Sequence, residues 1–175
     1  MGGFRLKKAM INYIQNPKND ELYTPRYAIE PLIKYIPRDL IIWECTDYGS
    51  SNITKLFREN GNIVITTHKK DLNFLTDKPD FDFDIIITNP PYSLKDEFLQ
   101  KCYEYGKPFA LLLPITALEG VERGKMFREH GIELLVLDKR CDFLDNKKSN
   151  WFNTSWFCYR VLPKQLIFEE LKKTN

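Results

Sequence analysis

Short runs of consecutive apolar residues alternate along this chain with segments in which apolar residues recur every three or four positions. Uninterrupted apolar runs are typical of strands buried on both faces of a parallel sheet, and the wider spacing is typical of amphipathic helices. The predicted strands are 40–43, 63–65, 85–87, 109–113 and 132–137, and the predicted helices are 24–36, 52–60, 95–105 and 118–130. This alternation predicts an α/β doubly wound sheet with right-handed crossovers.

The ends of the predicted elements carry local signals. Thr24-Pro25 offers a hydroxyl at the cap and proline at the first helical position, and Pro37 closes that helix. Pro31 inside it predicts a kink. Toward the end of the chain, 151–161 and 166–168 predict a terminal antiparallel pair, which is common at the edge of a parallel sheet.

Size and composition favour a single core. The chain has 175 residues, of which 43% are hydrophobic. This length is enough for one well-formed core but too short for two domains with cores of their own. We expect an arm at 1–20 that becomes ordered on contact, followed by one domain at 21–175. The formal net charge of +2 does not indicate an extended positive surface for nucleic acid, so any such binding must come from local positive patches.

Several classes of protein and site are not expected. No apolar run is long enough to span a bilayer and no secretory segment is visible, which predicts a cytoplasmic protein. The four cysteines are widely spaced and lack a C-x-x-C pair, which predicts reduced structural thiols. His68 and His130 have no partners at metal-ligand spacing, so we expect no zinc site.

The predicted strand at 85–87 continues through Thr88 into Asn89-Pro90-Pro91-Tyr92. Two consecutive prolines lock their own backbone angles and remove two amide donors, so the strand must stop and the nearby carbonyls are left to accept from a ligand. The alternative interpretation is a stiff loop with Tyr92 as a core aromatic. An acceptor-rich corner at the end of a buried strand is the strongest functional signal in the sequence.

This corner resembles the catalytic motif of the amino-group DNA methyltransferases, in the branch that methylates the N6 amine of adenine. The resemblance implies a Rossmann-like methyltransferase fold, a mostly parallel seven-stranded sheet with a C-terminal antiparallel hairpin. It also implies that the side-chain oxygen of Asn89 and the carbonyl of Pro90 accept the two N–H bonds of the amine, that Pro91 stiffens the corner, and that Tyr92 stacks on a flipped-out base.

The resemblance further implies S-adenosylmethionine as cofactor, although several cofactor positions depart from the family. Tyr23-Thr24-Pro25 looks like the segment that meets the methionine end, with an ordinary helix cap as the alternative. In the loop after the first predicted strand only Gly49 of two family glycines remains, and the second is replaced by a serine. The cofactor-contacting positions carried over from the family are Tyr23, Thr24, Pro25, Glu44, Thr46, Asp47, Gly49, Thr67, Asn73 and Phe74.

The departures weaken the predicted cofactor site. Thr67 stands where a carboxylate normally holds the ribose hydroxyls, and Asn73-Phe74 stands where the family has Asp-Phe beside the adenine. If each lost contact costs about 1 to 3 kcal/mol, cofactor affinity falls by orders of magnitude or is lost. For the substrate, the resemblance implies contacts from Ser93 and from Trp151 or Phe152, with a helix cap and an apolar edge hairpin as the respective alternatives.

Two function hypotheses remain. The first is a small methyltransferase of phage or mobile-element type that acts on adenine N6 in nucleic acid, with DNA favoured over RNA. The second is a catalytically inactive methyltransferase fold that binds a protein or nucleotide partner, for example as a phage anti-defence or regulatory protein. A transferase using another nucleotide through Lys69 and Lys70 is disfavoured because the glycine-rich phosphate cradle is missing.

Overall fold

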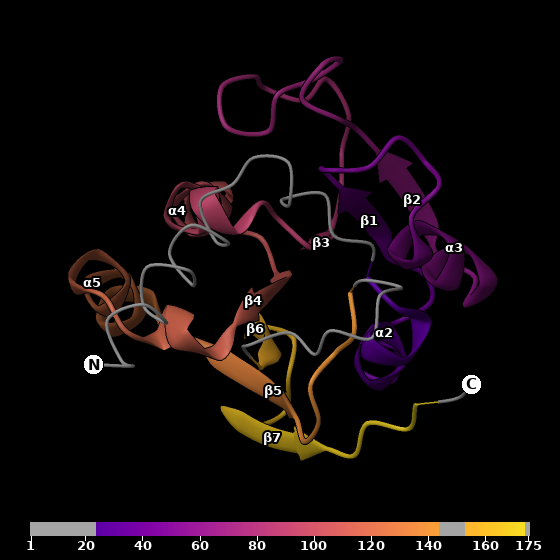
Figure 1. Cartoon of the computed structure of the whole chain (residues 1–175). Coiled ribbons are helices and arrows are strands. Elements are labelled where there is room, and N and C mark those ends of the chain that lie inside the picture. Colours follow the sequence, from indigo (N-terminus) through magenta and orange to yellow (C-terminus); the bar gives the residue numbers. More distant parts are fainter. Residues whose placement is uncertain (1–23, 144–152, 174–175) are drawn as a thin grey trace, which may run out of the picture.

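The computed structural model describes residues 24–143 and 153–173, and within them one sheet has the strand order β2-β1-β3-β4-β6-β5-β7 (Figure 1). Its strands are β1 (Ile41–Glu44), β2 (Ile63–Thr66), β3 (Ile85–Thr88), β4 (Phe109–Pro114), β5 (Glu133–Leu137), β6 (Thr154–Tyr159) and β7 (Leu166–Glu169). All of β3 and β4 is buried, because helices cover both faces of the sheet there, and this explains their unbroken apolar sequences.

The predicted fold class is confirmed. Four strand pairs are parallel, β1 with β2, β1 with β3, β3 with β4 and β5 with β7, and β6 runs antiparallel to β4 and β5. The pairing of the last two strands differs from the prediction of a terminal antiparallel pair. The strands β6 and β7 lie on either side of β5 instead of bonding to each other, because β6 inserts between β4 and β5 and leaves the outer edge of β5 to β7.

The helices are α2 (Arg26–Ile33), α3 (Asn52–Glu59), α4 (Lys95–Tyr105) and α5 (Val121–His130), with single turns η2 (Tyr92–Leu94) and η3 (Ile115–Leu118). The helix α4 has the predicted bounds. The helix predicted at 118–130 is divided, since Gly120 takes φ +146° between η3 and α5, and Val121 is 85% exposed. The helix α2 begins after Pro25, whose backbone is extended, so Thr24 is not its cap.

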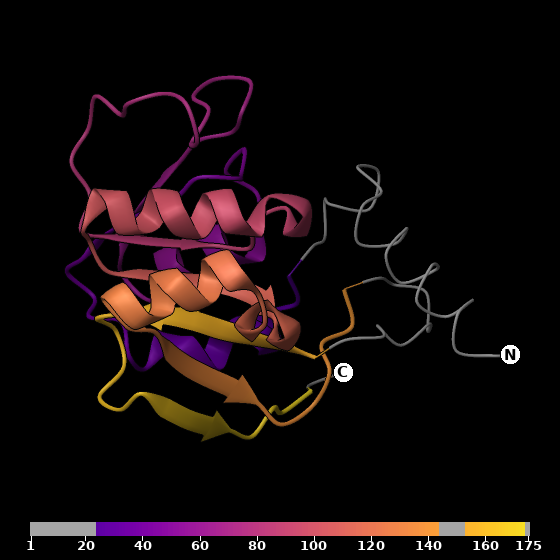
Figure 2. The ribbon, with the colours of Figure 1, turned by 90° about the vertical axis from the view of Figure 1, so that its left-hand side faces the viewer.

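The helices form two layers (Figures 1 and 2). The helices α2 and α3 cover one face of the sheet, where Ile29, Phe57 and Trp156 are buried in a shared core. The helices α4 and α5 lie against the other face, over a second core that includes Phe98, Phe109 and Phe157. The carboxyl ends of β1, β2 and β3 therefore open at one edge between the two layers, where open α/β sheets bind ligands.

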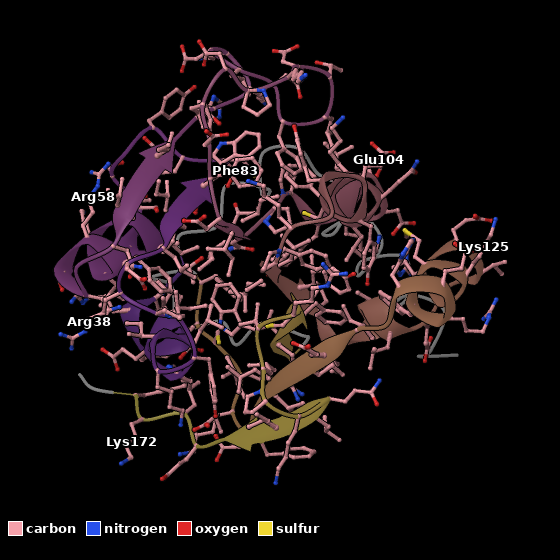
Figure 3. The ribbon with its side chains drawn as sticks, turned by 180° about the vertical axis from the view of Figure 1, so that it is seen from behind. Arg38, Arg58, Phe83, Glu104, Lys125 and Lys172 are labelled. Carbon is pink, nitrogen blue, oxygen red and sulfur yellow. The ribbon has the colours of Figure 1, made fainter. Side chains whose placement is uncertain are left out.

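The crossover from β2 to β3 is the loop 67–84, which projects beyond the sheet in Figure 1. Aromatic packing anchors it, because Phe74, Phe81 and Phe83 surround the ring of Trp43 at centroid distances of 5.1, 5.3 and 4.9 Å. Figure 3 shows Phe83 inside the molecule, whereas Glu104 on α4 points outward. The loop is thus held to β1 without a helix of its own.

The cysteines can also be compared with the prediction of structural thiols. All four cysteines, Cys45, Cys102, Cys141 and Cys158, are buried thiols outside any disulfide, as predicted. The proposed arm at 1–20 lies outside the described residues, and the single domain at 21–175 stays a prediction. No helix in the described ranges combines the length and apolar character needed to cross a membrane.

Candidate active site

The loop after β1, the end of β2 and the corner after β3 meet at the carboxyl edge of the sheet. The loop after β1 is joined to β2 by backbone hydrogen bonds from Thr67 N to Glu44 O at 3.0 Å and from Asp47 N to Thr67 O at 3.1 Å. These bonds extend the β1–β2 ladder past the last strand residues. Most of the predicted cofactor positions are therefore brought to one edge of the sheet.

Glu44 is a buried carboxyl group at the end of β1, only 1% exposed. Its Oε1 accepts hydrogen bonds from Thr88 Oγ1 at 2.5 Å, Thr46 Oγ1 at 3.0 Å and Thr46 N at 3.1 Å. Burial raises the pKa of Glu44 to about 7, although the hydrogen bonds from Thr88 and Thr46 act in the opposite direction. Near neutral pH this carboxyl group is thus close to half protonated.

The two threonines also contact each other, with their Oγ1 atoms 2.7 Å apart. Glu44, Thr46 and Thr88 therefore form a hydrogen-bonded cluster, the Glu44 cluster, that joins the ends of β1 and β3. Thr88 directly precedes Asn89, so this cluster fixes the point where the proline corner leaves the sheet. The sequence prediction missed Thr88, although a hydroxyl at the end of one parallel strand beside an acid at the end of the next was a usable signal.

Asp47 organises the loop that follows. Its carboxylate accepts from Ser50 N, from Ser51 N and from Thr54 Oγ1, the last at 2.6 Å. Burial alone would raise the pKa of Asp47, but the hydrogen bonds from Thr54, Ser51 and Ser50 outweigh it and lower the pKa below its usual value. The predicted ligand contact is therefore a carboxylate already engaged in holding the start of α3, where Ser51 is the N-cap.

Gly49 and Tyr48 close this loop over the end of β2. Gly49 has φ +100°, which disfavours residues other than glycine, and a Cβ at this position would lie 3.5 Å from Thr66 Oγ1. Tyr48 is 59% exposed and stacks on His68 with ring centroids 3.9 Å apart. Gly49 is thus needed for the backbone conformation, and the aromatic pair lies next to Thr67 at the end of β2.

The proline corner is tied to the start of α2. Asn89 Nδ2 donates to Thr24 Oγ1 at 3.0 Å across 65 residues of sequence, and Thr24 is itself buried. The carbonyl of Thr24 accepts from Asn52 Nδ2 at the beginning of α3, at 2.9 Å. The Thr-Pro and Asn-Pro-Pro-Tyr segments, which the sequence analysis placed in one site, are therefore in direct contact. Pro25 lies next to this contact as the residue before α2.

The rest of the corner continues into α4. Pro90 is buried, and among residues 24–143 and 153–173 no hydrogen bond reaches its carbonyl oxygen. Leu94 N donates to Pro91 O at 2.9 Å, which closes the η2 turn, and Tyr92 is 4% exposed within the core on the α4 side. Ser93 is exposed, and it does not cap α4, whose N-cap is Leu94.

The remaining predicted cofactor positions serve mainly internal contacts. Thr67 Oγ1 accepts from Trp43 Nε1 at 2.9 Å. Asn73 Oδ1 accepts from Leu75 N at 3.1 Å, within the turn that its own segment forms. Phe74 is 2% exposed and stacks on Phe98 at 4.9 Å, so its ring belongs to the aromatic core around Trp43.

Three predicted residues, Tyr23, Trp151 and Phe152, lie outside the described residues. Within the described ranges, no cluster of three or more histidine, cysteine or acidic side chains could hold a metal ion. A cavity of about 350 Å³ lies between the 67–84 loop and α4, and none of the predicted site residues lines it. The carboxyl edge of the sheet is therefore the candidate site on the grounds of its residues and their hydrogen bonds.

No protein-family model matches this sequence, and no curated protein matches it. Among solved structures, the chain is similar to a protein assigned as a modification subunit of a type I restriction enzyme from Vibrio vulnificus YJ016, with a TM-score of 0.54 and 11% identity. That match covers 98% of this chain and 51% of the other, so this chain spans about half the length of that protein.

The chain is also similar to a protein from Listeria monocytogenes that is assigned to the class I S-adenosylmethionine-dependent methyltransferases. The TM-score is 0.51 and the identity 12%, with 96% of this chain and 72% of the other covered. These similarities show that the chain has the fold of an S-adenosylmethionine-dependent methyltransferase.

Proposed function

We propose that this chain transfers a methyl group from S-adenosylmethionine to the exocyclic N6 amine of adenine in nucleic acid, with DNA as the favoured substrate. The observation that carries the proposal is the hydrogen bond between Asn89 and Thr24, which joins the Asn-Pro-Pro-Tyr corner to the Thr-Pro segment. The similarity to a modification subunit of a restriction enzyme supports nucleic acid as the substrate class.

The chemistry requires acceptors for the hydrogens of an aromatic amine. The lone pair of such an amine is delocalised into the ring, so the nitrogen is a poor nucleophile until that pair is localised. Acceptance of its two N–H bonds by the side-chain oxygen of Asn89 and the carbonyl oxygen of Pro90 would favour a tetrahedral nitrogen. The hydrogen bond from Asn89 Nδ2 to Thr24 orients the amide, and the two prolines hold the carbonyl. Asn89 Oδ1 and Pro90 are buried, so neighbouring groups would have to move before an amine could reach the two acceptors.

Tyr92 would supply the stacking surface for the extruded base. Its backbone is fixed in the η2 turn and its ring is packed against the α4 side of the core. The ring is 4% exposed, so it would have to be uncovered before a base could stack on it. Ser93, exposed at the same turn, would contact the substrate.

The cofactor would supply an electrophilic methyl group on a sulfonium. The residues present fit its methionine end better than its nucleoside end. Gly49 permits close backbone approach beside Thr66, Glu44 and Thr46 lie at the end of β1, and Thr24 lies next to the start of α2, bonded to Asn89. Asp47 is committed to Ser50, Ser51 and Thr54, and Thr67 offers a hydroxyl in place of a carboxylate. We therefore expect weak cofactor binding.

The test is transfer of a radiolabelled methyl group to adenine-containing duplex and single-stranded DNA, and to RNA. Asn89→Ala should lower the rate constant kcat about a hundredfold or more, because one of the two acceptors is lost. The control is Gln100→Ala, an exposed change on α4 that should keep wild-type activity. Unchanged transfer by Asn89→Ala, with circular dichroism confirming that both variants are folded, would show that the acceptor is assigned wrongly.

A second candidate function is a methyltransferase fold that binds a partner without catalysis. The engagement of the Asp47 carboxylate by its own loop favours this alternative, since the cofactor would have to displace those contacts. Isothermal titration with S-adenosylmethionine and with S-adenosylhomocysteine separates the two candidates. Saturable heat supports the enzyme, and no heat at millimolar ligand supports the binding module.

A further inference from the structure

The strand β7 forms the outer edge of the sheet on the side away from β2 (Figures 1 and 2). Its partner on one side is β5, paired in parallel from Leu134 with Leu166 to Leu137 with Glu169. On its other side no strand of the described ranges pairs with it. An unpaired strand edge presents backbone groups that can bond to another chain.

The direction of these groups follows from the β5–β7 ladder. Leu134 N donates to Gln165 O at 2.8 Å and Asp138 N donates to Glu169 O at 3.1 Å. In a parallel ladder alternate residues direct both backbone groups to the same neighbour, so the odd-numbered residues of this segment face β5. Leu166 and Phe168 therefore direct their N–H and C=O groups to the free edge.

The side chains of β7 alternate between the two faces of the sheet. Glu169 accepts from Tyr35 and pairs with Lys34 of the α2 segment, and Ile167 packs on the α2–α3 core. The even-numbered side chains point to the opposite face, where Leu166 is 51% and Phe168 69% exposed. Lys164 and Glu170 flank them and are also exposed. Lys164 lies in the bend before β7 and Glu170 directly follows the strand, so the exposed even-numbered residues read Lys, Leu, Phe, Glu at 164, 166, 168 and 170.

The opposite edge of the sheet is protected. The outward carbonyl of Val64 on β2 accepts from Arg58 Nη2 at 3.0 Å, and Figure 3 shows Arg58 at the periphery of the molecule beside this strand. No side chain within residues 24–143 and 153–173 covers Leu166 or Phe168 of β7 in this way. In the part of the chain that the structure describes, the β2 edge thus has a side chain bonded to an outward carbonyl and the β7 edge has none.

We propose that β7 is a self-association surface on which two copies of this chain pair antiparallel, centred on Ile167 of each. In this register Leu166 faces the partner's Phe168, and Lys164 faces the partner's Glu170. Each of these is a hydrogen-bonded pair, because the even-numbered residues carry the outward backbone groups. The outer pattern is self-complementary under a twofold axis, with apolar pairs inside and opposite charges outside.

Neighbouring registers do not match. If Leu166 pairs with its own copy, Lys164 lies opposite the partner's Phe168. If Phe168 pairs with its own copy, Leu166 lies opposite the partner's Glu170, and Lys164 lies opposite the partner's Lys172. Both place a charge opposite an apolar side chain, and the second also opposes like charges. The charge pattern therefore selects one register, and the pairing extends the seven-stranded sheet through the partner.

Site-specific crosslinking tests the register. The variant Ile167→Cys should form a disulfide-linked dimer on mild oxidation, because a non-hydrogen-bonded antiparallel pair places the two Cα atoms about 4.5 Å apart. Leu166→Cys should not, since its own copy is diagonal to it and beyond about 7 Å. The native cysteines are buried, so the unmodified chain should stay uncrosslinked. Crosslinking through 166 and not 167 would overturn the proposed register.

Sedimentation velocity over a broad concentration series tests the association itself. The full chain should show a concentration-dependent dimer, Phe168→Lys should be monomeric, and Ile63→Lys on the exposed β2 edge should dimerise as the unmodified chain does. Lys164→Glu should raise the dimer dissociation constant about tenfold, and Lys164→Glu combined with Glu170→Lys should restore it. A chain that is monomeric throughout the series, or a double variant that is not restored, would rule out the proposed pairing.

Discussion

Glu44 holds a carboxyl group where three hydrogen bonds replace its contact with water. The cost of ionising it there exceeds what those bonds recover, so its pKa lies at about 7 instead of 4.5. The threonines of the Glu44 cluster act as donors to this group, and each belongs to a different segment of the edge. The cluster therefore couples the protonation state of one residue to the junction of β1 and β3.

This placement predicts a pH dependence of folding. Between pH 4.5 and about 7 the unfolded chain releases the Glu44 proton while the folded chain keeps it, so stability should fall as pH rises through this window. The difference of about 2.5 between the two pKa values corresponds to roughly 3 kcal/mol. The variant Glu44→Gln keeps a neutral group of the same shape at every pH in this window. Its unfolding free energy, relative to that of the wild type, should therefore rise as pH increases from 4.5 to about 7.

Urea unfolding at a series of pH values from 4 to about 8 measures this difference, with the exposed Glu97→Gln as control for unrelated titrations. A constant difference between Glu44→Gln and the wild type would contradict the raised pKa.

At the same scale, Thr24 shows the limit of a sequence signal. It was assigned both as a helix cap and as a cofactor contact, and the structure uses its hydroxyl to bind Asn89.

At the scale of elements, the segment between β1 and α3 is held by the carboxylate of Asp47. The bonds to Asp47 hold Ser50, Ser51 and Thr54, so one carboxylate organises the turn and the first turn of the helix. Only Gly49 retains a conformation that favours glycine, with φ +100°. The loop is therefore held by hydrogen bonds to one carboxylate, with a single glycine at the position of positive φ.

The hydrogen bonds to Asp47 in this loop predict the effect of Asp47→Ala on stability. Removing the carboxylate leaves three backbone or hydroxyl donors without their acceptor, which should lower the free energy of unfolding by about 2 to 3 kcal/mol. Denaturant unfolding at neutral pH measures it, and Asp71→Ala, an exposed acid in the 67–84 loop, is the control that should change stability little. A loss as small as that of the control would mean that the loop is held by the β1–β2 ladder and the Tyr48–His68 stack.

The elements themselves were predictable to different degrees. The helix α4 and the strands β3 and β4 follow from unbroken or periodic apolar sequences, because burial alone determines them. The break at Gly120 was missed, because Leu118 and Val121 continue a helical spacing although Val121 is exposed. Apolar spacing thus predicts a helix reliably only where the apolar face is buried.

At the scale of the whole molecule, the first and last parts of the described chain are joined through the sheet. Trp156 of β6 is fully buried on the α2–α3 side, and its Nε1 donates to Ala28 O in α2 at 2.8 Å, across 128 residues of sequence. Because α2 also carries the residues next to Thr24, the position of the proline corner depends on contacts made by the C-terminal strands. This hydrogen bond therefore ties β6 to α2 within the core on the α2–α3 side.

This arrangement predicts one cooperative unfolding transition. Trp156→Phe removes the hydrogen bond and part of the buried volume, and should lower stability by about 2 to 3 kcal/mol without changing the dependence on denaturant. Fluorescence, to which Trp43 in the other core contributes, and far-ultraviolet circular dichroism should give coincident transitions. Two separate transitions would show that α2 and the C-terminal strands form a unit distinct from β1 to β3.

The sequence by itself determined the order of the elements and the position of the proline corner, because local apolar pattern and the fixed geometry of proline act over a few residues. The tertiary structure decided what those residues contact. It placed β6 between β4 and β5, joined Asn89 to Thr24, buried Phe74 against Trp43 and put β7 at the end of the sheet that the described residues form. Each of these depends on segments far apart in the chain that meet only when the sheet is assembled, and no local pattern encodes such a meeting.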